Sequence, residues 1–197
     1  MVQTPSTLSS KLSSKLSSKI TLEEFLKLPE TKPAREYIDG EILQKPMPQG
    51  KHSIIQTELA SAINVALKPQ RIARAFLELR CTFGGISIVP DLSVFVWDII
   101  PRDSSGQVAN IFAAAPDWAI EIMSPNQRQT KVTKKMLRCL QFETELCWLI
   151  DPEEQTVLVY GRDRQPEIFE ESATYLTVPE FASDFQLTVG ELFDWLF

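Results

Sequence analysis

Two short segments of the chain are apolar on both faces, and each carries an acid at its start or in its middle. Residues 91–98 (DLSVFVWD) begin with Asp91, and residues 117–124 (DWAIEIMS) hold Glu121 between two isoleucines. A strand that is apolar on both faces is typical of the interior of a sheet covered on both sides by helices. The two segments therefore predict a layered protein built around a central sheet.

Helical patterns lie before and between these strands. The capping-box pattern Thr21-Leu22-Glu23-Glu24 predicts a short helix that ends near Pro29. Apolar residues at helical spacing predict a longer helix over 51–68, and a further helix is expected over 126–144. Other elements are expected as a hairpin over 35–45, strands over 71–80, 146–151, 155–161 and 166–171, and a terminal helix over 189–197. This order predicts an α/β fold, a mixed β-sheet flanked by helices.

The chain has 197 residues, which suits one domain. Residues 9–20 repeat Ser, Lys and one aliphatic residue with a period of four, so this segment can bury little surface. We therefore expect a disordered tail over 1–20 and a single domain over 21–197.

Composition and charge argue against membrane proteins, exported proteins and general nucleic-acid coat proteins. No apolar run approaches the roughly 18–20 residues of a membrane helix, and the N-terminus lacks the apolar core of a signal peptide, so no membrane contact is expected. Three cysteines without metal-type spacing indicate free thiols in a reducing compartment, which favours the cytoplasm. The net charge of −6 disfavours a general nucleic-acid coat protein, but it leaves room for one local basic face.

Asp91 and Glu121 are the unusual residues, since a carboxylate in an apolar strand is costly to bury unless it is paired or holds a cation. In a structural interpretation, Asp91 caps the turn after Pro90 and Glu121 pairs with a basic helix residue. In a functional one, carboxylates on neighbouring strands converge within about 5 Å of each other and hold a hard cation such as Mg²⁺. A lysine from the following helix would then stabilise charge on a phosphate or help to activate water.

Several motifs occur in a distinctive order: Val89-Pro90-Asp91, PDWAIEIMSPN (116–126), Lys135 and WLIDP (148–152). Together with TLEEFLKLP (21–29), EYIDGEI (36–42) and His52, this set resembles the Uma-type endonuclease family of the PD-(D/E)XK restriction-endonuclease-like superfamily. The resemblance implies a restriction-endonuclease-like core that hydrolyses phosphodiester bonds in DNA. It also implies that Asp91 and Glu121 ligate Mg²⁺ or Mn²⁺.

In the superfamily the catalytic lysine lies two residues after the second acid, where this chain has Met123. The Uma-type pattern moves that lysine to the following helix, where it aligns with Lys135. The chain departs from the family at three nearby positions, with Lys131 in place of an Asp, Cys139 in place of a Tyr and Glu143 in place of a Gly. A decayed nuclease that acts as a nucleic-acid- or protein-binding module is therefore the alternative function.

Other residues join the candidate site less directly. His52, the only histidine, is either a helix-start residue or a catalytic partner, and the resemblance favours catalysis. Either Glu36 or Glu41 could supply a third carboxylate. Arg128, Lys131 and Arg138 share one helix face with no acid, and we expect this basic stripe to contact DNA phosphates. The apolar C-terminus FDWLF (193–197) could form a homodimer interface or pack on the domain's own core.

Overall fold

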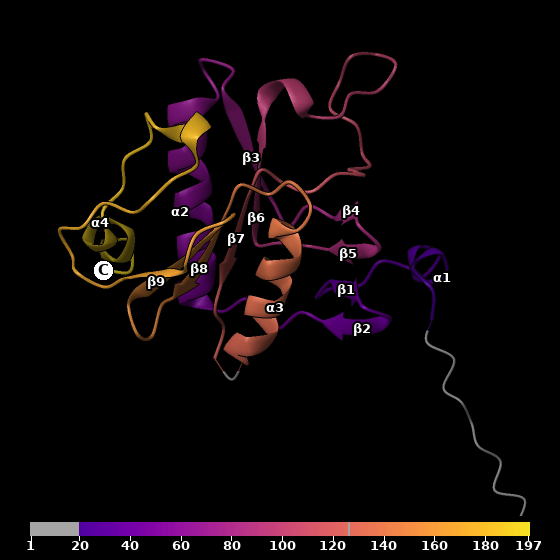
Figure 1. Cartoon of the computed structure of the whole chain (residues 1–197), viewed down its shortest axis with the longest axis horizontal. Coiled ribbons are helices and arrows are strands. Elements are labelled where there is room, and N and C mark those ends of the chain that lie inside the picture. Colours follow the sequence, from indigo (N-terminus) through magenta and orange to yellow (C-terminus); the bar gives the residue numbers. More distant parts are fainter. Residues whose placement is uncertain (1–19, 126) are drawn as a thin grey trace, which may run out of the picture.

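The computed structural model describes residues 20–125 and 127–197, and it contains two sheets with helices around them (Figure 1). The expected tail over 1–20 lies, apart from Ile20, outside the described residues. The carbonyl of Ile20 accepts a hydrogen bond of 2.9 Å from the Tyr37 hydroxyl, which ties this residue to the domain.

The larger sheet has six strands in the order β10-β9-β8-β7-β6-β3. Only β7 and β8 pair in parallel, so the sheet is mixed, as the sequence predicts. The strands are β3 (Ala73–Leu77), β6 (Leu92–Val96), β7 (Trp118–Ile122), β8 (Leu146–Asp151), β9 (Thr156–Gly161) and β10 (Glu167–Phe169).

The smaller sheet has four strands in the order β2-β1-β5-β4, and all its pairs are antiparallel. The strands are β1 (Arg35–Ile38), β2 (Glu41–Gln44), β4 (Cys81–Phe83) and β5 (Ile86–Ile88). The β1–β2 hairpin turns at Asp39-Gly40, as expected, but the sequence analysis missed the β4–β5 hairpin. Its strands have only three residues each, and its turn is made by Gly84 and Gly85, both at positive φ.

The helices are α1 (Leu22–Leu26), α2 (Gly50–Leu67), α3 (Gln129–Leu140) and α4 (Val189–Asp194), with short 3₁₀ turns η1 (Trp97–Ile99) and η2 (Glu180–Ala182). The predicted capping box is present at Thr21. Helix α3 is shorter than predicted, because it begins after Arg128 rather than at Asn126. Glu143, just beyond the helix, has a φ of 68°, a conformation that suits the glycine of the family pattern.

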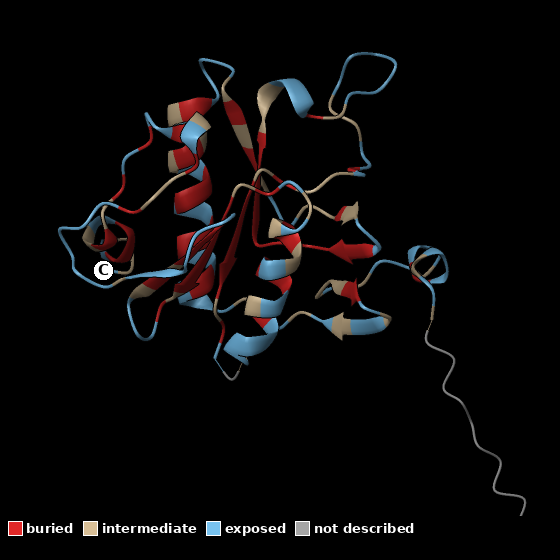
Figure 2. Ribbon diagram, in the orientation of Figure 1, coloured by how far each residue is buried: buried red, intermediate tan, exposed pale blue. Residues whose placement is uncertain are grey.

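Each face of the six-stranded sheet has its own core (Figure 2). On one face α2 and α4 pack against alternate residues of β6 and β7, such as Trp118 and Ile120. On the other face α3 packs through Val132, Met136 and Cys139, and the smaller sheet adds its isoleucines. Leu137, on the same helix, is exposed.

The C-terminal segment packs on the domain's own core. Phe193 is buried within the α2–α4 core, and Trp195 and Leu196 pack against that core, while Phe197 is exposed. The homodimer therefore stays a prediction without support from this segment. Among the described residues, no helix combines the length and apolarity that crossing a membrane requires.

Candidate active site

Strand alternation places Glu121 and Asp91 on the same side of the six-stranded sheet. Trp118, Ile120 and Ile122 of β7 belong to the α2–α4 core, so Glu121 faces the α3 side. Asp91 directly precedes β6, whose Leu92 is paired with Ile120 in antiparallel register. The Ile122 amide donates a hydrogen bond of 2.8 Å to Asp91 Oδ2, which brings the two acids to one end of the sheet.

Asp91 is 2% exposed and is surrounded by donors. Lys45 Nζ lies 2.6 Å from Asp91 Oδ1, and His52 Nε2 lies 3.1 Å from Asp91 Oδ2. Burial alone would raise the pKa of Asp91, but the Lys45 ammonium and the His52 contact outweigh it and hold that pKa well below its usual range. Asp91 is thus an ionised carboxylate at neutral pH.

Glu121 is 1% exposed and lies between two ammonium groups. Lys135 Nζ is 2.6 Å from Glu121 Oε1, and Lys45 Nζ is 4.0 Å from Glu121 Oε2. Burial raises the pKa of Glu121 to about 7; the negative charges of Asp91 and Glu36 act in the same direction, and the two lysines oppose them. The two acids therefore differ in their proton affinity although they share Lys45.

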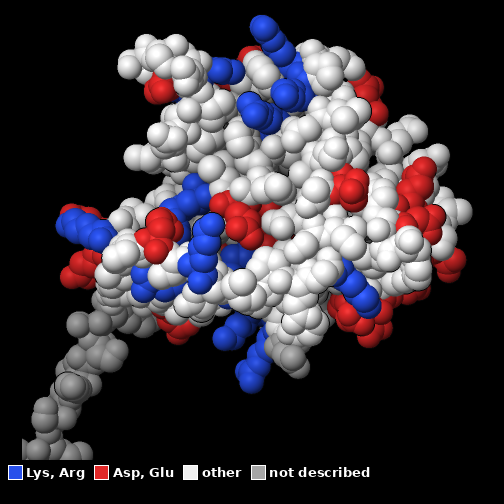
Figure 3. All heavy atoms as spheres, turned by 180° about the vertical axis from the view of Figure 1, so that it is seen from behind, with Lys and Arg blue, Asp and Glu red and all other residues white. Residues whose placement is uncertain are grey.

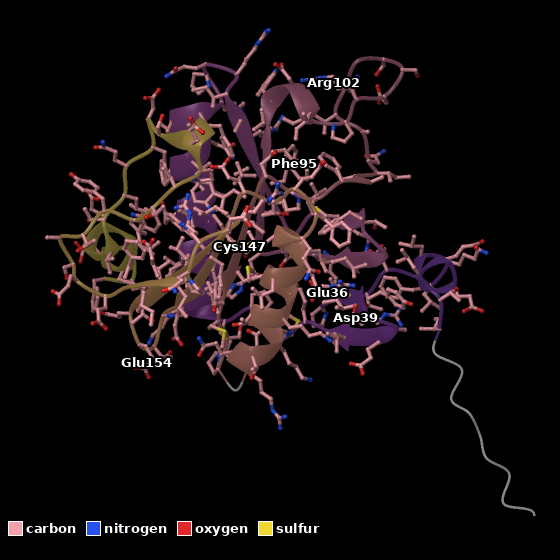
Figure 4. All side chains as sticks on the ribbon, in the orientation of Figure 1. Glu36, Asp39, Phe95, Arg102, Cys147 and Glu154 are labelled. Carbon is pink, nitrogen blue, oxygen red and sulfur yellow. The ribbon has the colours of Figure 1, made fainter. Side chains whose placement is uncertain are left out.

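Lys135 reaches the site from α3 and links Glu121 to a third carboxylate. Its Nζ lies 2.9 Å from Glu36 Oε1, and Glu36 also accepts a hydrogen bond of 2.8 Å from the Val89 amide. Figure 4 shows Glu36 beside α3. Burial would lower the pKa of Lys135, but the charges of Glu121 and Glu36 raise it well above its usual value, so Lys135 is a cation.

The late start of α3 explains how Lys135 reaches so far. Lys135 lies six residues after Gln129, about 9 Å along the axis at about 1.5 Å per residue, because the helix starts after Arg128. Glu36 is the acid from the N-terminal hairpin that joins the cluster, whereas Glu41 is exposed. The alternative between these two residues is thereby decided by their position.

Sequence reasoning missed Lys45 and Gln56. Lys45 follows β2, and besides the two acids it contacts the Val89 carbonyl at 2.7 Å. Gln56 of α2 donates to the Asp91 carbonyl at 3.0 Å. No local signal marks Lys45, because a lysine at the end of a largely exposed strand is ordinary and only the tertiary fold carries it to the acids.

The carboxylate oxygens of the cluster suit a hard divalent cation, since Mg²⁺ is usually bound by one or two carboxylates and keeps several waters. Asp91 and Glu121 offer carboxylate oxygens on the same face, both near one ammonium. Across residues 20–125 and 127–197 no group of three or more His, Cys, Asp and Glu side chains is arranged to hold a metal ion. Asp91 and Glu121 are the residues that could hold such an ion.

The predicted basic stripe divides into two parts. Arg138 forms an ion pair of 2.8 Å with Asp39, which also pairs at 2.9 Å with Lys134 outside the stripe, whereas Arg128 and Lys131 have no ion-pair partner among the described residues. Figure 3, which views the molecule from behind, shows Lys and Arg interspersed with Asp and Glu on that face. On the α3 side, Arg128 and Lys131 are the stripe cations available to a polyanion.

The three cysteines play no visible part in this cluster. Cys81, Cys139 and Cys147 are free and buried. Burial raises the pKa of the Cys81 thiol to about 12 and raises that of Cys147 well above its ordinary value. These are properties of core residues and not of nucleophiles.

Comparison with known proteins identifies a similar crystal structure and a matching family. A crystal structure of a protein from Anabaena variabilis ATCC 29413, described as a putative nuclease belonging to DUF820, superposes with a TM-score of 0.89 at 62% sequence identity. The match covers 90% of this chain and 99% of that one. No curated protein matches the chain. Residues 22–190 match the family described as "Uma2: Putative restriction endonuclease", and the chain therefore belongs to the Uma2 family.

Proposed function

We propose that this protein is a metal-dependent endonuclease that hydrolyses phosphodiester bonds in DNA. The observation that carries the proposal is the burial of Asp91, Glu121 and Glu36 together with Lys45 and Lys135 at one end of a sheet. Buried ion clusters add little to stability, so their presence supports a functional role. Membership of a nuclease family points to the same chemistry.

In this proposal Asp91 and Glu121 hold Mg²⁺ or Mn²⁺. The bound ion supplies charge neutralisation at the phosphate and lowers the pKa of a bound water. His52 and the Ile122 amide orient Asp91 through its Oδ2. This support keeps one candidate ligand ionised and fixed in direction, which is what outer contacts of a metal ligand usually do.

Lys135 assists the attacking water or the transition state. In hydrolysis the water oxygen forms a bond to phosphorus, and the bond from phosphorus to one ester oxygen breaks. The attacking water loses a proton, and the leaving ester oxygen gains a proton. The Lys135 ammonium counters the charge that develops on the phosphate oxygens. Glu36 positions that ammonium, since it contacts Lys135 Nζ at 2.9 Å and is itself held by the Val89 amide.

A nicking assay on supercoiled plasmid tests the proposal. Wild type should nick with Mn²⁺ or Mg²⁺ and not with EDTA, and Asp91→Asn should lose at least about 10²-fold in rate, the typical loss for one preorganised transition-state contact. Asp98→Asn is the matched control because Asp98 is an exposed acid at the other end of the same strand segment. Nicking by Asp91→Asn at the wild-type rate would contradict the proposal.

The alternative is a binding module that has kept the fold and lost the chemistry. One observation favours it: two lysine ammoniums already contact the candidate metal ligands. Melting curves separate the alternatives, because Mn²⁺ should raise the melting temperature of wild type and not of Asp91→Asn if the site binds metal. Absence of both nicking and metal-induced stabilisation in wild type would favour the binding module.

A further inference from the structure

Two neighbouring cavities open onto the buried cluster. The first, of about 590 Å³, includes Lys45, His52, Asp91 and Glu121 in its lining. The second, of about 520 Å³, includes Glu36, Lys45 and Lys135. Three residues line both cavities, namely Lys45, Pro46 and Gln127. The cavities therefore meet at Lys45, directly above the carboxylates that the proposed function requires.

The outer parts of the two cavities differ in chemistry. The second cavity is bordered by Arg128 and Lys131, the two cations of the basic stripe that have no ion-pair partner among the described residues. The first cavity presents apolar surface from Met47, which is exposed, and from Pro33 and Pro48. The second cavity therefore favours a negatively charged group. The first offers apolar contacts beside a lining of mixed charge that includes Glu30, Lys32, Glu78 and Arg80.

The dimensions limit the form of a ligand that spans both cavities. The two cavities have similar volumes, about 590 and 520 Å³, and they share part of their lining. Cavities of about 300–1,000 Å³ are typical of small-ligand sites. Asp91 and Glu121 are almost fully buried, so a phosphate must enter the cavities to approach them. One flexible strand can bend into the cavities and bring a phosphate to these acids without carrying a paired strand with it.

We propose that the substrate bound at this site is single-stranded nucleic acid, with one phosphate at Lys45 and the flanking nucleotides in the two cavities. The inference rests on the proposed nuclease function and specifies its substrate. Lys45, Lys131 and Arg128 contact the backbone, and the Met47 side of the first cavity contacts base faces. Sequence-tolerant single-strand binding generally combines a cationic groove with surfaces that contact base faces, most often aromatic ones; here the cations border the second cavity and Met47, Pro33 and Pro48 supply the apolar surface.

Fluorescence anisotropy with the full chain tests the proposal. The probes are a fluorescein-labelled 12-nucleotide single strand and a hairpin duplex that contains the same sequence, both with Ca²⁺ in place of Mg²⁺ so that cleavage does not interfere. We expect the single strand to bind at least about tenfold more tightly than the duplex, the size of effect produced by one or two base contacts. Equal or tighter binding of the duplex, or no binding of either probe, overturns the proposal.

A matched pair of variants tests the location. Lys131→Glu should weaken single-strand binding and reduce its salt dependence, because Lys131 lines the second cavity. Lys134→Glu should change binding far less, because Lys134 does not line this cavity and is paired with Asp39. Equal losses in the two variants would overturn the assignment to the cavity. Metal-dependent cleavage of the same probes is scored separately: tight single-strand binding without cleavage contradicts the nuclease function and not the ligand class.

Discussion

The two faces of the six-stranded sheet differ in what they bury, although the same strands form both. The face covered by α2 and α4 buries Trp118, Ile120 and their neighbours in an apolar core. The face covered by α3 also has an apolar core, but at one end it buries Asp91 and Glu121 beside Lys135. Within β7 a single residue step separates the two environments, since Ile120 and Glu121 point in opposite directions.

The comparison teaches what each face contributes. Apolar burial stabilises a fold by roughly 25 cal/mol per Å² removed from water. A buried ion cluster is different, because the cost of removing charges from water offsets most of their mutual attraction. Breaking such a cluster is nevertheless expensive, since the remaining charge is left without a partner. The apolar face should therefore govern stability alone, and the charged end should couple stability to ions and pH.

The largest expected effect comes from Lys135→Ala. It leaves Glu121 and Glu36 buried without their shared cation, so we expect the free energy of unfolding to fall by about 3–5 kcal/mol and cleavage to be lost. The variant should therefore lose stability as well as activity. Chemical denaturation measures the change. Lys134→Ala is the control, and its exposed pair with Asp39 should be worth less than about 1 kcal/mol. Similar losses in the two variants would contradict the comparison.

Ile120→Ala tests the apolar face. Ile120 is fully buried, and its truncation should cost about 2–5 kcal/mol, because apolar burial is reduced and a cavity is left behind. The increase in melting temperature produced by Mn²⁺ should stay as in wild type, because Ile120 points away from the charged cluster. A loss of the metal response in this variant would show that the two faces are not separate.

The pH dependence of stability sharpens the comparison for Glu121. The pKa of Glu121 is raised to about 7 in the folded protein from an ordinary value of 4.5, so between these values the folded state binds a proton that the unfolded state has lost. The free energy of unfolding should therefore decrease as pH rises from about 5 to about 7, with a slope of up to about 1.4 kcal/mol per pH unit. The lowered pKa of Asp91 acts in the opposite direction, but only below about pH 4.

Denaturation in EDTA across pH 5–8 measures this contribution. It should be absent from Glu121→Gln and present in Glu58→Gln, where the substituted residue is exposed on α2. Identical pH profiles for wild type and Glu121→Gln would show that Glu121 does not titrate in this range.

Lys45→Met probes the competition between an ammonium and a divalent cation. Lys45 Nζ contacts Asp91 and approaches Glu121, so Lys45 and a divalent cation need the same oxygens. Removal of one positive charge from this position should tighten Mn²⁺ binding about tenfold or more, since like charges at such distances repel by more than about 1 kcal/mol at low effective dielectric. Isothermal titration calorimetry measures the affinity. Lys51→Met, at an exposed lysine, is the control, and weaker metal binding by Lys45→Met would contradict the competition.

The smallest effects are expected on the basic stripe. Replacement of Arg128, Lys131 and Arg138 by Glu should weaken DNA binding without unfolding the protein. The slope of log affinity against log salt should fall by about one unit for each phosphate that the stripe no longer neutralises. Arg138 should contribute least, because it is already paired with Asp39. Measurements of affinity across a salt titration for the triple variant and for each single variant resolve the three contributions, and an unchanged slope would leave the stripe as a solvated surface.

The sequence by itself determined the main elements and the central acids. Short apolar runs, the capping box at Thr21 and the Asp39-Gly40 turn are local signals, because they depend on neighbours a few residues away. They predicted α1, the β1–β2 hairpin and the strands that carry Asp91 and Glu121. The two acids were noticeable for the same local reason, since a carboxylate in an apolar run is costly unless something compensates it.

Only the tertiary structure decided which residues compensate these acids. Lys45 and Asp91 are 46 positions apart in sequence, and Glu36 and Lys135 are 99 apart, so no local pattern connects them. Glu36 and not Glu41 joins the cluster because the tertiary fold brings Glu36 to 2.9 Å from Lys135 on α3, whereas Glu41 is exposed. Ion pairs act through space over a few ångströms, and the chain segments that supply them meet only when both sheets have formed.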